Sequence, residues 1–290
     1  MPAGRLSAPQ RRLLDWGARV RRDLPWRGSR DPWLVLVSEV MLGQTQVGRV
    51  EPRWSAFAER WPTPASLAAD PLSGLLVFWQ GLGYPRRAVN LHHSAGVIVA
   101  EHGGAVPSSL DELLSLRGVG PYTARAVLAF ALEADVGVVD TNIARVLARV
   151  AGERLTPRRA QELADGWVPA GQGWAWNQSM MDLGALRCRP VAPSCVGCPL
   201  ARECRWRLGG FASPDPAIGS AGVSGRQARY QGSDRQLRGR VLDRLVEGPL
   251  PAEEVGEVVG AAGRAGSIID GLVADGLVSR VGGTLVLGGG

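Results

Sequence analysis

All four cysteines of the chain lie within one window of 17 residues, spaced as Cys188-x6-Cys195-x2-Cys198-x5-Cys204. A disulfide framework would spread its cysteines along a small secreted chain, whereas this chain has 290 residues and we expect no signal segment in it. Four thiolates this close together are typical of one metal centre, either tetrahedral zinc or an iron–sulfur cluster. The single Cys-x2-Cys with cysteines on wider arms favours a cuboidal cluster, and four unrelated core cysteines are the weaker alternative.

The composition agrees with an intracellular protein that binds nucleic acid. The net charge is +6 and the isoelectric point about 9.9, so the chain is attracted to polyanions. The hydrophobic fraction of 45% is that of a globular protein, and no apolar run is long enough to span a membrane. All 33 basic residues are arginine, because the sequence contains no lysine.

The chain is predicted to be helical as far as Cys204. Its helical segments are 33–46, 51–60, 71–79, 85–102, 108–115, 121–133, 142–151, 157–166 and 174–186. A Gly-, Ser- and Pro-rich stretch, 207–233, is predicted to be a linker. Amphipathic helices near 234–247 and 263–276, followed by a β-hairpin around Gly282-Gly283, indicate a small winged-helix-like module at 234–290.

The segment Leu116–Ala124 predicts a contact with a DNA phosphate. Gly118 and Gly120 enclose a valine between two helical segments, and Pro121 begins the second of them. Such a turn exposes successive backbone N–H groups at a helix N-terminus, where the helix dipole also favours an anion. An ordinary helix–helix turn is the alternative.

Two carboxylates are candidates for catalysis. Glu39 lies in a helix that is apolar on nearly every face, where an ionised carboxylate must be paired, neutralised or open to a cleft. Such a group suits a general acid, although it could also lie at the edge of the apolar stripe. Asp140 directly precedes a helix, and on its own position it is better explained as a simple N-cap.

Several of these motifs together resemble the HhH-GPD superfamily of DNA glycosylases. Leu116–Ala124 is similar to its helix-hairpin-helix, Asp140 follows at the usual distance, and the cysteine quartet resembles the 4Fe–4S loop of one branch. Within that branch, further motifs resemble the MutY family of A/G-specific adenine glycosylases over about residues 8–206. These motifs are Leu24–Arg27, Ser38–Leu42, Gln44–Gln46, Gly81–Tyr84 and Asn177–Gly184.

The resemblance implies a mainly α fold of two helical domains with a DNA-binding cleft. A six-helix barrel would span 31–134, with the helix-hairpin-helix at about 113–130. The cluster domain would combine 135–206 with an N-terminal arm, 1–30. The expected partner is double-stranded DNA containing a mismatched adenine, which would be flipped out of the stack. We expect a monomer in the cytoplasm, associated with the nucleoid and not with a membrane.

The resemblance also implies a role for each matching residue. Glu39 would protonate the adenine and Asp140 would stabilise the sugar cation, with Tyr122 and Asn142 supporting that carboxylate. The resemblance likewise assigns residues to the adenine pocket, to the wedge inserted around the partner base and to the phosphate contact. They are Trp26, Arg27 and Asp182; Gln44, Thr45, Leu82 and Tyr84; and Gly118, Gly120, Thr123 and Ala124. The 4Fe–4S cluster bound by the four cysteines would shape a loop that displays arginines to phosphates.

Tyr122 favours a monofunctional enzyme. Bifunctional relatives carry a lysine at this position, whose amine attacks the sugar and permits strand cleavage. Because the chain has tyrosine here and no lysine elsewhere, we expect an intact strand with an abasic site and no efficient lyase activity.

Two departures from the family pattern affect the choice of partner base. Gly43 stands where the family usually has a further glutamine in the wedge loop. Residues 207–290 are too short for the NUDIX-like domain that reads 8-oxoguanine in many relatives. Base excision of adenine opposite 8-oxoguanine and guanine is therefore the leading hypothesis. A thymine or uracil mismatch glycosylase and a non-catalytic iron–sulfur redox sensor are the alternatives.

Overall fold

The computed structural model describes residues 5–223 and 229–288 and divides into two compact units. The first unit comprises Met1–Leu36, Ser108–Leu114 and Val119–Arg226, and the second comprises Val37–Pro107, Ser115–Gly118 and Gln227–Gly290. Helix α2 (Pro32–Leu42) contributes to both. Parts of the predicted N-terminal arm (1–4), linker (224–228) and C-terminal module (289–290) lie outside the described residues.

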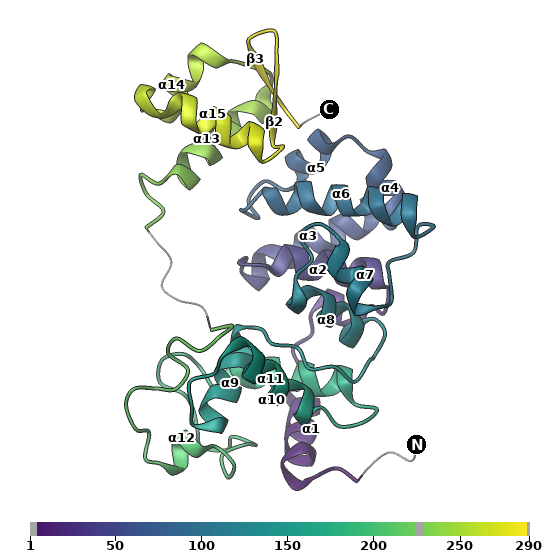
Figure 1. The fold of residues 1–290 in the computed structure, drawn as a ribbon, viewed down its shortest axis with the longest axis vertical. Coiled ribbons are helices and arrows are strands. Elements are labelled where there is room, and N and C mark those ends of the chain that lie inside the picture. Colours follow the sequence, from purple (N-terminus) through teal and green to yellow (C-terminus); the bar gives the residue numbers. More distant parts are fainter. Residues whose placement is uncertain (1–4, 224–228, 289–290) are drawn as a thin grey trace. The chain divides into compact units, whose positions relative to one another are not determined.

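In the first unit, α11 packs against α1, α8 and α9 (Figure 1). Its core contains Leu13, Trp176, Met180 and Leu183, each at most 2% exposed. Helices begin where the sequence supplies caps, since the side chain of Thr156 accepts a hydrogen bond from the Arg159 N–H before Pro157. The elements of this unit are α1 (Ala8–Val20), a 3₁₀ helix (Pro25–Gly28), α7 (Leu110–Ser115), α8 (Pro121–Phe130), α9 (Thr141–Ala151), α10 (Pro157–Trp167), α11 (Gly173–Leu186) and α12 (Arg205–Leu208).

In the second unit, α6 packs against α4 and α5 (Figure 1). Phe57, Trp61 and Phe78 form an aromatic cluster with ring centroids 5.0 to 5.9 Å apart. Such rings contribute much of the apolar area that a small core buries. The helices are α3 (Val47–Arg60), α4 (Pro64–Ala69), α5 (Leu72–Phe78) and α6 (Arg86–Glu101).

The same unit contains the C-terminal module, whose helices pack on a three-stranded antiparallel sheet of order β1-β3-β2. The predicted hairpin is confirmed, because β2 (Val278–Val281) pairs with β3 (Thr284–Leu287) across Gly282-Gly283, and both glycines have positive φ. The short strand β1 (Leu250–Pro251) was not predicted. The remaining elements are α13 (Asp234–Glu247), α14 (Val255–Val259) and α15 (Ala265–Ala274), with 3₁₀ turns at Ala252–Glu254 and Ala262–Arg264.

Much of the predicted linker is packed against the first unit. The Asp215 carboxylate pairs with Arg149 at 2.6 Å, and the Ser220 hydroxyl accepts a hydrogen bond from the Leu155 N–H at 2.9 Å. These contacts are polar, which explains why a stretch of low apolar content could be mistaken for a free connection. No helix in the described part of the chain is long and apolar enough to cross a membrane.

Candidate active site

Glu39 lies in α2 and is only 6% exposed. The apolar residues Val37 and Met41, on either side of it in the helix, are fully buried, as expected from the sequence. Glu39 belongs to the second unit.

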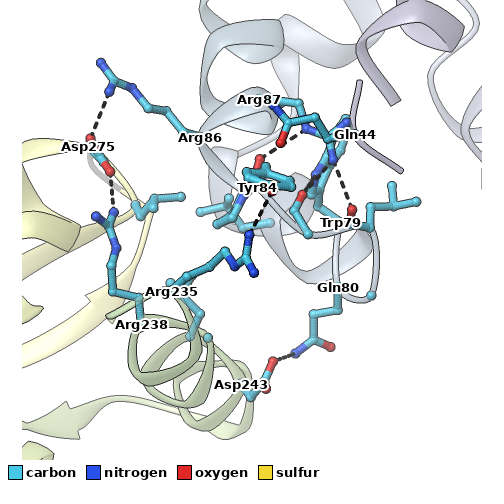
Figure 2. A pocket seen from close by; sticks show the side chains of 18 of the residues that line it. Gln44, Trp79, Gln80, Tyr84, Arg86, Arg87, Arg235, Arg238, Asp243 and Asp275 are labelled. Carbon is cyan, nitrogen blue, oxygen red and sulfur yellow. Dashed lines mark hydrogen bonds and ion pairs between the residues drawn. The ribbon is translucent and has the colours of Figure 1, made fainter. Parts of the chain in front are cut away.

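Two loops of the second unit carry the predicted wedge residues, and one arginine joins them (Figure 2). The guanidinium of Arg87 donates to the carbonyls of Val40 and Met41 at 2.6 and 2.9 Å, at the end of α2. It also donates to Thr45 Oγ1 at 2.9 Å and to the Leu82 carbonyl at 3.0 Å. Burial lowers the pKa of Arg87 to about 10. Sequence reasoning missed this residue, because an arginine two positions before a buried valine gives no sign of such a role.

The predicted wedge residues differ in burial and in backbone conformation. Leu82 is 3% exposed, and its carbonyl accepts from Thr45 Oγ1 at 2.8 Å. Tyr84 is half-buried. Gln44 and Tyr84 both have positive φ, 62° and 48°, which non-glycine residues adopt at some energetic cost. Such strained backbone often accompanies binding loops.

The helix-hairpin-helix turn is formed as predicted, between α7 and α8. Gly118 has a φ of +82°, and a Cβ there would lie 2.6 Å from the Asn90 amide nitrogen of α6. A side chain at this position would therefore disrupt both the turn and its packing. Gly120 is the N-cap residue of α8, and Tyr122, Thr123 and Ala124 lie in the first turn of that helix.

Asp140 is the N-cap of α9, and it is also held as a fixed carboxylate. One of its oxygens accepts from the Ile143 N–H at 2.6 Å, and the other accepts from the Asn142 side-chain amide at 3.0 Å. Burial raises the pKa of Asp140, and these two donors together with the charge of Arg145 oppose that rise. The capping role expected from sequence is therefore confirmed, and both oxygens of the carboxylate are held in place by donors from the start of α9.

Arg145 connects this carboxylate to the cysteine loop. It is 4% exposed and donates to Asn142 Oδ1 at 2.8 Å, to the Gly184 carbonyl at 2.7 Å and to the Cys188 carbonyl at 2.6 Å. The close approach of α9 to α11 requires a glycine at position 184, because a Cβ there would lie 2.5 Å from the Cβ of Asn142. Sequence reasoning missed Arg145, because on an amphipathic helix it falls on the polar face, whereas residues 143–150 of α9 are all buried.

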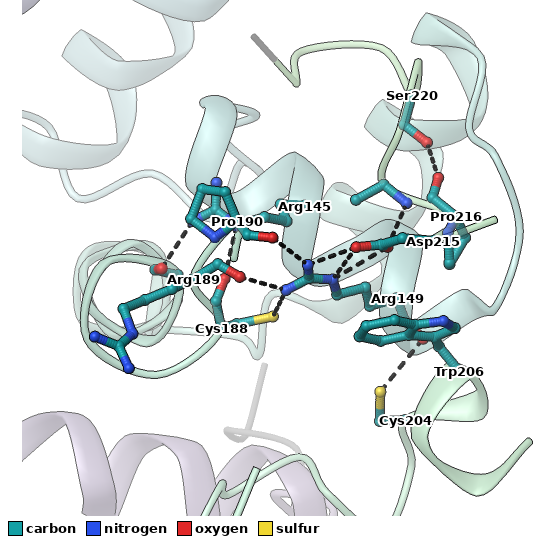
Figure 3. Close-up of polar contacts among 12 residues, drawn as sticks. Arg145, Arg149, Cys188, Arg189, Pro190, Cys204, Trp206, Asp215, Pro216 and Ser220 are labelled. Atoms are coloured by element: carbon teal, nitrogen blue, oxygen red, sulfur yellow. Dashed lines mark hydrogen bonds and ion pairs between the residues drawn. The ribbon is translucent and has the colours of Figure 1, made fainter. Parts of the chain in front are cut away.

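A second buried arginine, Arg149, lies against the cysteine loop (Figure 3). It donates to Cys188 Sγ at 3.3 Å and to the carbonyls of Arg189 and Pro190 at 2.8 and 3.1 Å. The Trp206 ring lies 4.7 Å from its guanidinium carbon, and Asp215 balances its charge. The loop backbone is thereby fixed from one side by α9.

The four predicted metal ligands, all free thiols, line one small cavity together with apolar side chains such as Val146, Leu183 and Leu200. Burial raises the pKa of Cys198 to about 11, and its nearby thiols add to this effect. Soft sulfur donors in an apolar shell fit iron or zinc, which would hold the thiols as thiolates. In the described part of the chain, no three His, Cys, Asp or Glu side chains are grouped closely enough to hold a metal ion.

Three of the predicted pocket residues lie together in the first unit. Asp182 is 1% exposed and receives both terminal nitrogens of Arg27, at 2.8 and 2.9 Å, and Arg22 Nε at 2.7 Å. Burial alone would raise the pKa of Asp182, but the two guanidinium groups outweigh it and the pKa is lowered. Asp182 is therefore an ionised partner that holds Arg27 in place. Trp26, which precedes Arg27 in the sequence, is also buried. Sequence reasoning missed Arg22.

Comparison with known proteins places these features in a family. Residues 37–170 match the HhH-GPD superfamily base excision DNA repair protein. The chain is 44% identical over 276 residues to Adenine DNA glycosylase of Mycolicibacterium smegmatis, an alignment that covers 92% of each chain. It is 40% identical to Adenine DNA glycosylase of Mycobacterium tuberculosis, covering 92% of this chain and 89% of the relative. The chain belongs to the adenine DNA glycosylase family.

Solved structures agree with the helical fold of this family. A thermostable thymine-DNA glycosylase is 30% identical, with a TM-score of 0.66, and the match covers 69% of this chain and 95% of that chain. A trapped endonuclease III–DNA covalent intermediate is 26% identical, with a TM-score of 0.61, and covers 72% and 100%. The similarity to adenine DNA glycosylases thus extends over more of the chain, at higher identity, than these structural matches do.

Proposed function

We propose that this chain is a monofunctional DNA glycosylase of base excision repair, which removes adenine mispaired with 8-oxoguanine or guanine and leaves an abasic site. The observation that carries the proposal is the 44% identity to an adenine DNA glycosylase over 92% of both chains. The retention of Glu39 and Asp140 supports catalysis, because a DNA-binding redox sensor would need neither carboxylate.

The proposed mechanism divides the work between the two carboxylates. Adenine is rotated out of the duplex, since its glycosidic bond is not accessible while the base is stacked. Glu39 protonates N7 of the adenine, which makes the base a better leaving group. Asp140 stabilises the oxocarbenium-like sugar, and the donors from Asn142 and Ile143 hold its oxygens in place. Water completes the hydrolysis.

The monofunctional assignment rests on Tyr122. No amine is available at this place in the hairpin to attack the sugar carbon, and the chain has no lysine to replace it. Tyr122 lies in the first turn of α8 and would support the Asp140 carboxylate instead of forming a Schiff base.

We further propose the following DNA contacts for the remaining site residues. Trp26 and the Arg27–Asp182 pair line the adenine pocket. Gln44, Thr45, Leu82 and Tyr84 form the wedge at the partner base, and the N–H groups of Gly118, Gly120, Thr123 and Ala124 bind a phosphate. The proposal keeps the division into a barrel domain (31–134) and a cluster domain (135–206 with 1–30), followed by a winged-helix module at 234–290.

The cysteine loop is proposed to hold a 4Fe–4S cluster through Cys188, Cys195, Cys198 and Cys204. The donor set supports this, because four thiols share one apolar cavity beside Arg149. The cluster would supply structure, not a redox step. Arg187, Arg189, Arg202 and Arg205 would then be displayed to DNA phosphates. We expect the protein to act as a monomer on nucleoid DNA in the cytoplasm.

A thymine or uracil mismatch glycosylase is the second candidate, favoured by the 30% identity to a thymine-DNA glycosylase. A panel of duplexes separates the two: A opposite 8-oxoguanine, A opposite guanine, and T or U opposite guanine, each with and without alkaline cleavage of abasic sites. The proposal predicts alkali-dependent cleavage at the mismatched adenine. Release of T or U from the guanine mismatches, with the adenine duplexes untouched, would establish the second candidate.

A further inference from the structure

A large pocket lies inside the second unit, where the wedge loops face the C-terminal module (Figure 2). Its volume is about 890 Å³. One side is formed by Gln44, Leu82 and Tyr84, and the other by α13 and the sheet. A cavity of this size can admit a nucleobase, which is much smaller than a drug-sized ligand.

Several of the charges that line this pocket are already paired. Asp275 receives Arg238 and also Arg86, the latter at 3.4 Å, and Asp234 pairs with Arg264. Arg235 is exposed, and like Arg49 and Arg87 of the same pocket it has no carboxylate partner among the described residues. Its recorded polar contact is a hydrogen bond to the Tyr84 hydroxyl at 2.9 Å. Its remaining N–H donors face the pocket without an anionic partner in the described chain.

Arg235 is also held by two aromatic rings. Its guanidinium carbon lies 5.7 Å from the centroid of Tyr84 and 5.1 Å from that of Tyr230 (Figure 2 shows the Tyr84 contact). Stacking of this kind keeps a guanidinium oriented and adds to its attraction for a flat partner. The module thus places an oriented donor group at the wedge loop through Tyr84, which like Gln44 has a strained backbone.

We propose that Arg235 completes the partner-base site by donating to the N7 and O6 atoms of a guanine opposite the adenine. These atoms are a pair of acceptors that suits the fork of an arginine side chain. They are free of base pairing once the adenine has rotated out of the duplex. The inference rests on the proposed adenine glycosylase function and assigns to the C-terminal module a direct part in the choice of partner base.

An arginine contact of this kind distinguishes guanine from 8-oxoguanine. Oxidation at C8 places a hydrogen on N7, which turns one of the two acceptors into a donor. The Arg235 side chain therefore suits guanine better than 8-oxoguanine. Its contact raises adenine release opposite guanine, so the preference of the enzyme for 8-oxoguanine over guanine becomes smaller than the wedge loop alone would give. Loss of Arg235 should widen that preference.

The test uses the full chain, Arg235→Gln, and duplexes with adenine opposite guanine, 7-deazaguanine or 8-oxoguanine. Arg240→Gln is the matched control, because it removes the same charge from the same helix. The guanidinium of Arg240 donates to the Val259 carbonyl and not to Tyr84. Single-turnover release of adenine is measured. Binding is measured in parallel with a 2′-fluorinated adenosine that resists hydrolysis.

For Arg235→Gln, we expect a loss of about 5- to 150-fold opposite guanine, the range of one well-made base contact, and a smaller loss opposite 8-oxoguanine. The wild type should discriminate against 7-deazaguanine relative to guanine, and Arg235→Gln should not. Arg240→Gln should keep the wild-type pattern with all three partners.

Three results would overturn the inference. They are an unchanged 7-deazaguanine effect in Arg235→Gln, an equal loss with every partner in both variants, and an equal gain with every partner, which would make the module a cover over the wedge loop. The binding arm gives an answer even if adenine is never released. Failure of wild-type release therefore counts against the proposed function, while loss of the partner pattern counts against Arg235.

Discussion

Asp140 has two roles at the scale of a single residue, and two substitutions separate them. Asp140→Asn keeps an oxygen that can accept from the Ile143 N–H, so the cap of α9 survives, and it removes a carboxylate whose ionised form is disfavoured by burial. We expect base release to fall by at least about 10²-fold, with an unfolding temperature equal to or above that of the wild type. Asp140→Ala should lose activity and also about 1 kcal/mol of stability from the missing cap. Near-normal turnover in Asp140→Asn would leave only the capping role.

Asn142 should set the pH at which Asp140 becomes active. Burial raises the pKa of Asp140, and the Asn142 amide lowers it by donating to the charged form. Because the proposed role needs the ionised carboxylate, activity is lost as the pH falls through that pKa. Asn142→Ala removes one opposing donor, so the acidic limb of the single-turnover rate should move to higher pH than in the wild type. A limb that stays in place while the rate falls at every pH would mean that Asn142 acts only on structure.

At the scale of elements, Arg87 is expected to determine whether the two wedge loops keep one arrangement. Arg87→Ala would remove the donor that the Val40, Met41, Leu82 and Gly83 carbonyls share, most of them at part-buried positions. We expect a loss of at least about 2 kcal/mol in the free energy of unfolding, with weaker discrimination among partner bases. Arg86→Ala is the matched control, since its side chain is 62% exposed and it forms one outer ion pair. That substitution should cost about 1 kcal/mol or less. Equal losses of stability in the two variants, measured by chemical denaturation, would contradict the account.

Features of this chain that depend on neighbouring residues could be predicted from the sequence, whereas contacts between distant residues could not. The hairpin of β2 and β3 and the beginning of α9 follow from Gly282-Gly283 and from Asp140, which act on neighbouring residues. The buried arginines could not be assigned partners from sequence, because Arg145 and Arg149 bond to groups about 40 positions away. An arginine in a sequence indicates a solvated charge until its acceptors are brought to it.

The same distinction applies to whole segments. Residues 207–223 have the composition of a linker, but they are ordered through polar contacts such as Asp215 with Arg149. Strand β1 has only two residues, one of them a proline, so no periodicity could indicate it. The motif residues of the candidate site, by contrast, were found by resemblance to a family. Such a resemblance indicates the role of a residue but not the groups that it contacts.

At the scale of the whole molecule, the cysteine loop should hold the C-terminal part of the first unit in its DNA-binding form. Protein purified anaerobically should be brown and contain about four irons per chain, as expected for one 4Fe–4S cluster. Cys198→Ser should lose the iron and weaken duplex binding, while the aromatic core of the second unit around Trp61 keeps its structure. Colourless protein with one tightly bound zinc would contradict the cluster assignment.

The central claim is that this chain hydrolyses mismatched adenine without cutting the strand. The most direct measurement quantifies free adenine and strand length after a single turnover on a duplex with A opposite 8-oxoguanine, for the wild type and for Glu39→Gln. The account predicts one adenine released per duplex by the wild type, a strand that breaks only after alkali, and release at least about 10²-fold slower in Glu39→Gln. An absence of free adenine, or strand breaks that form without alkali, would contradict it.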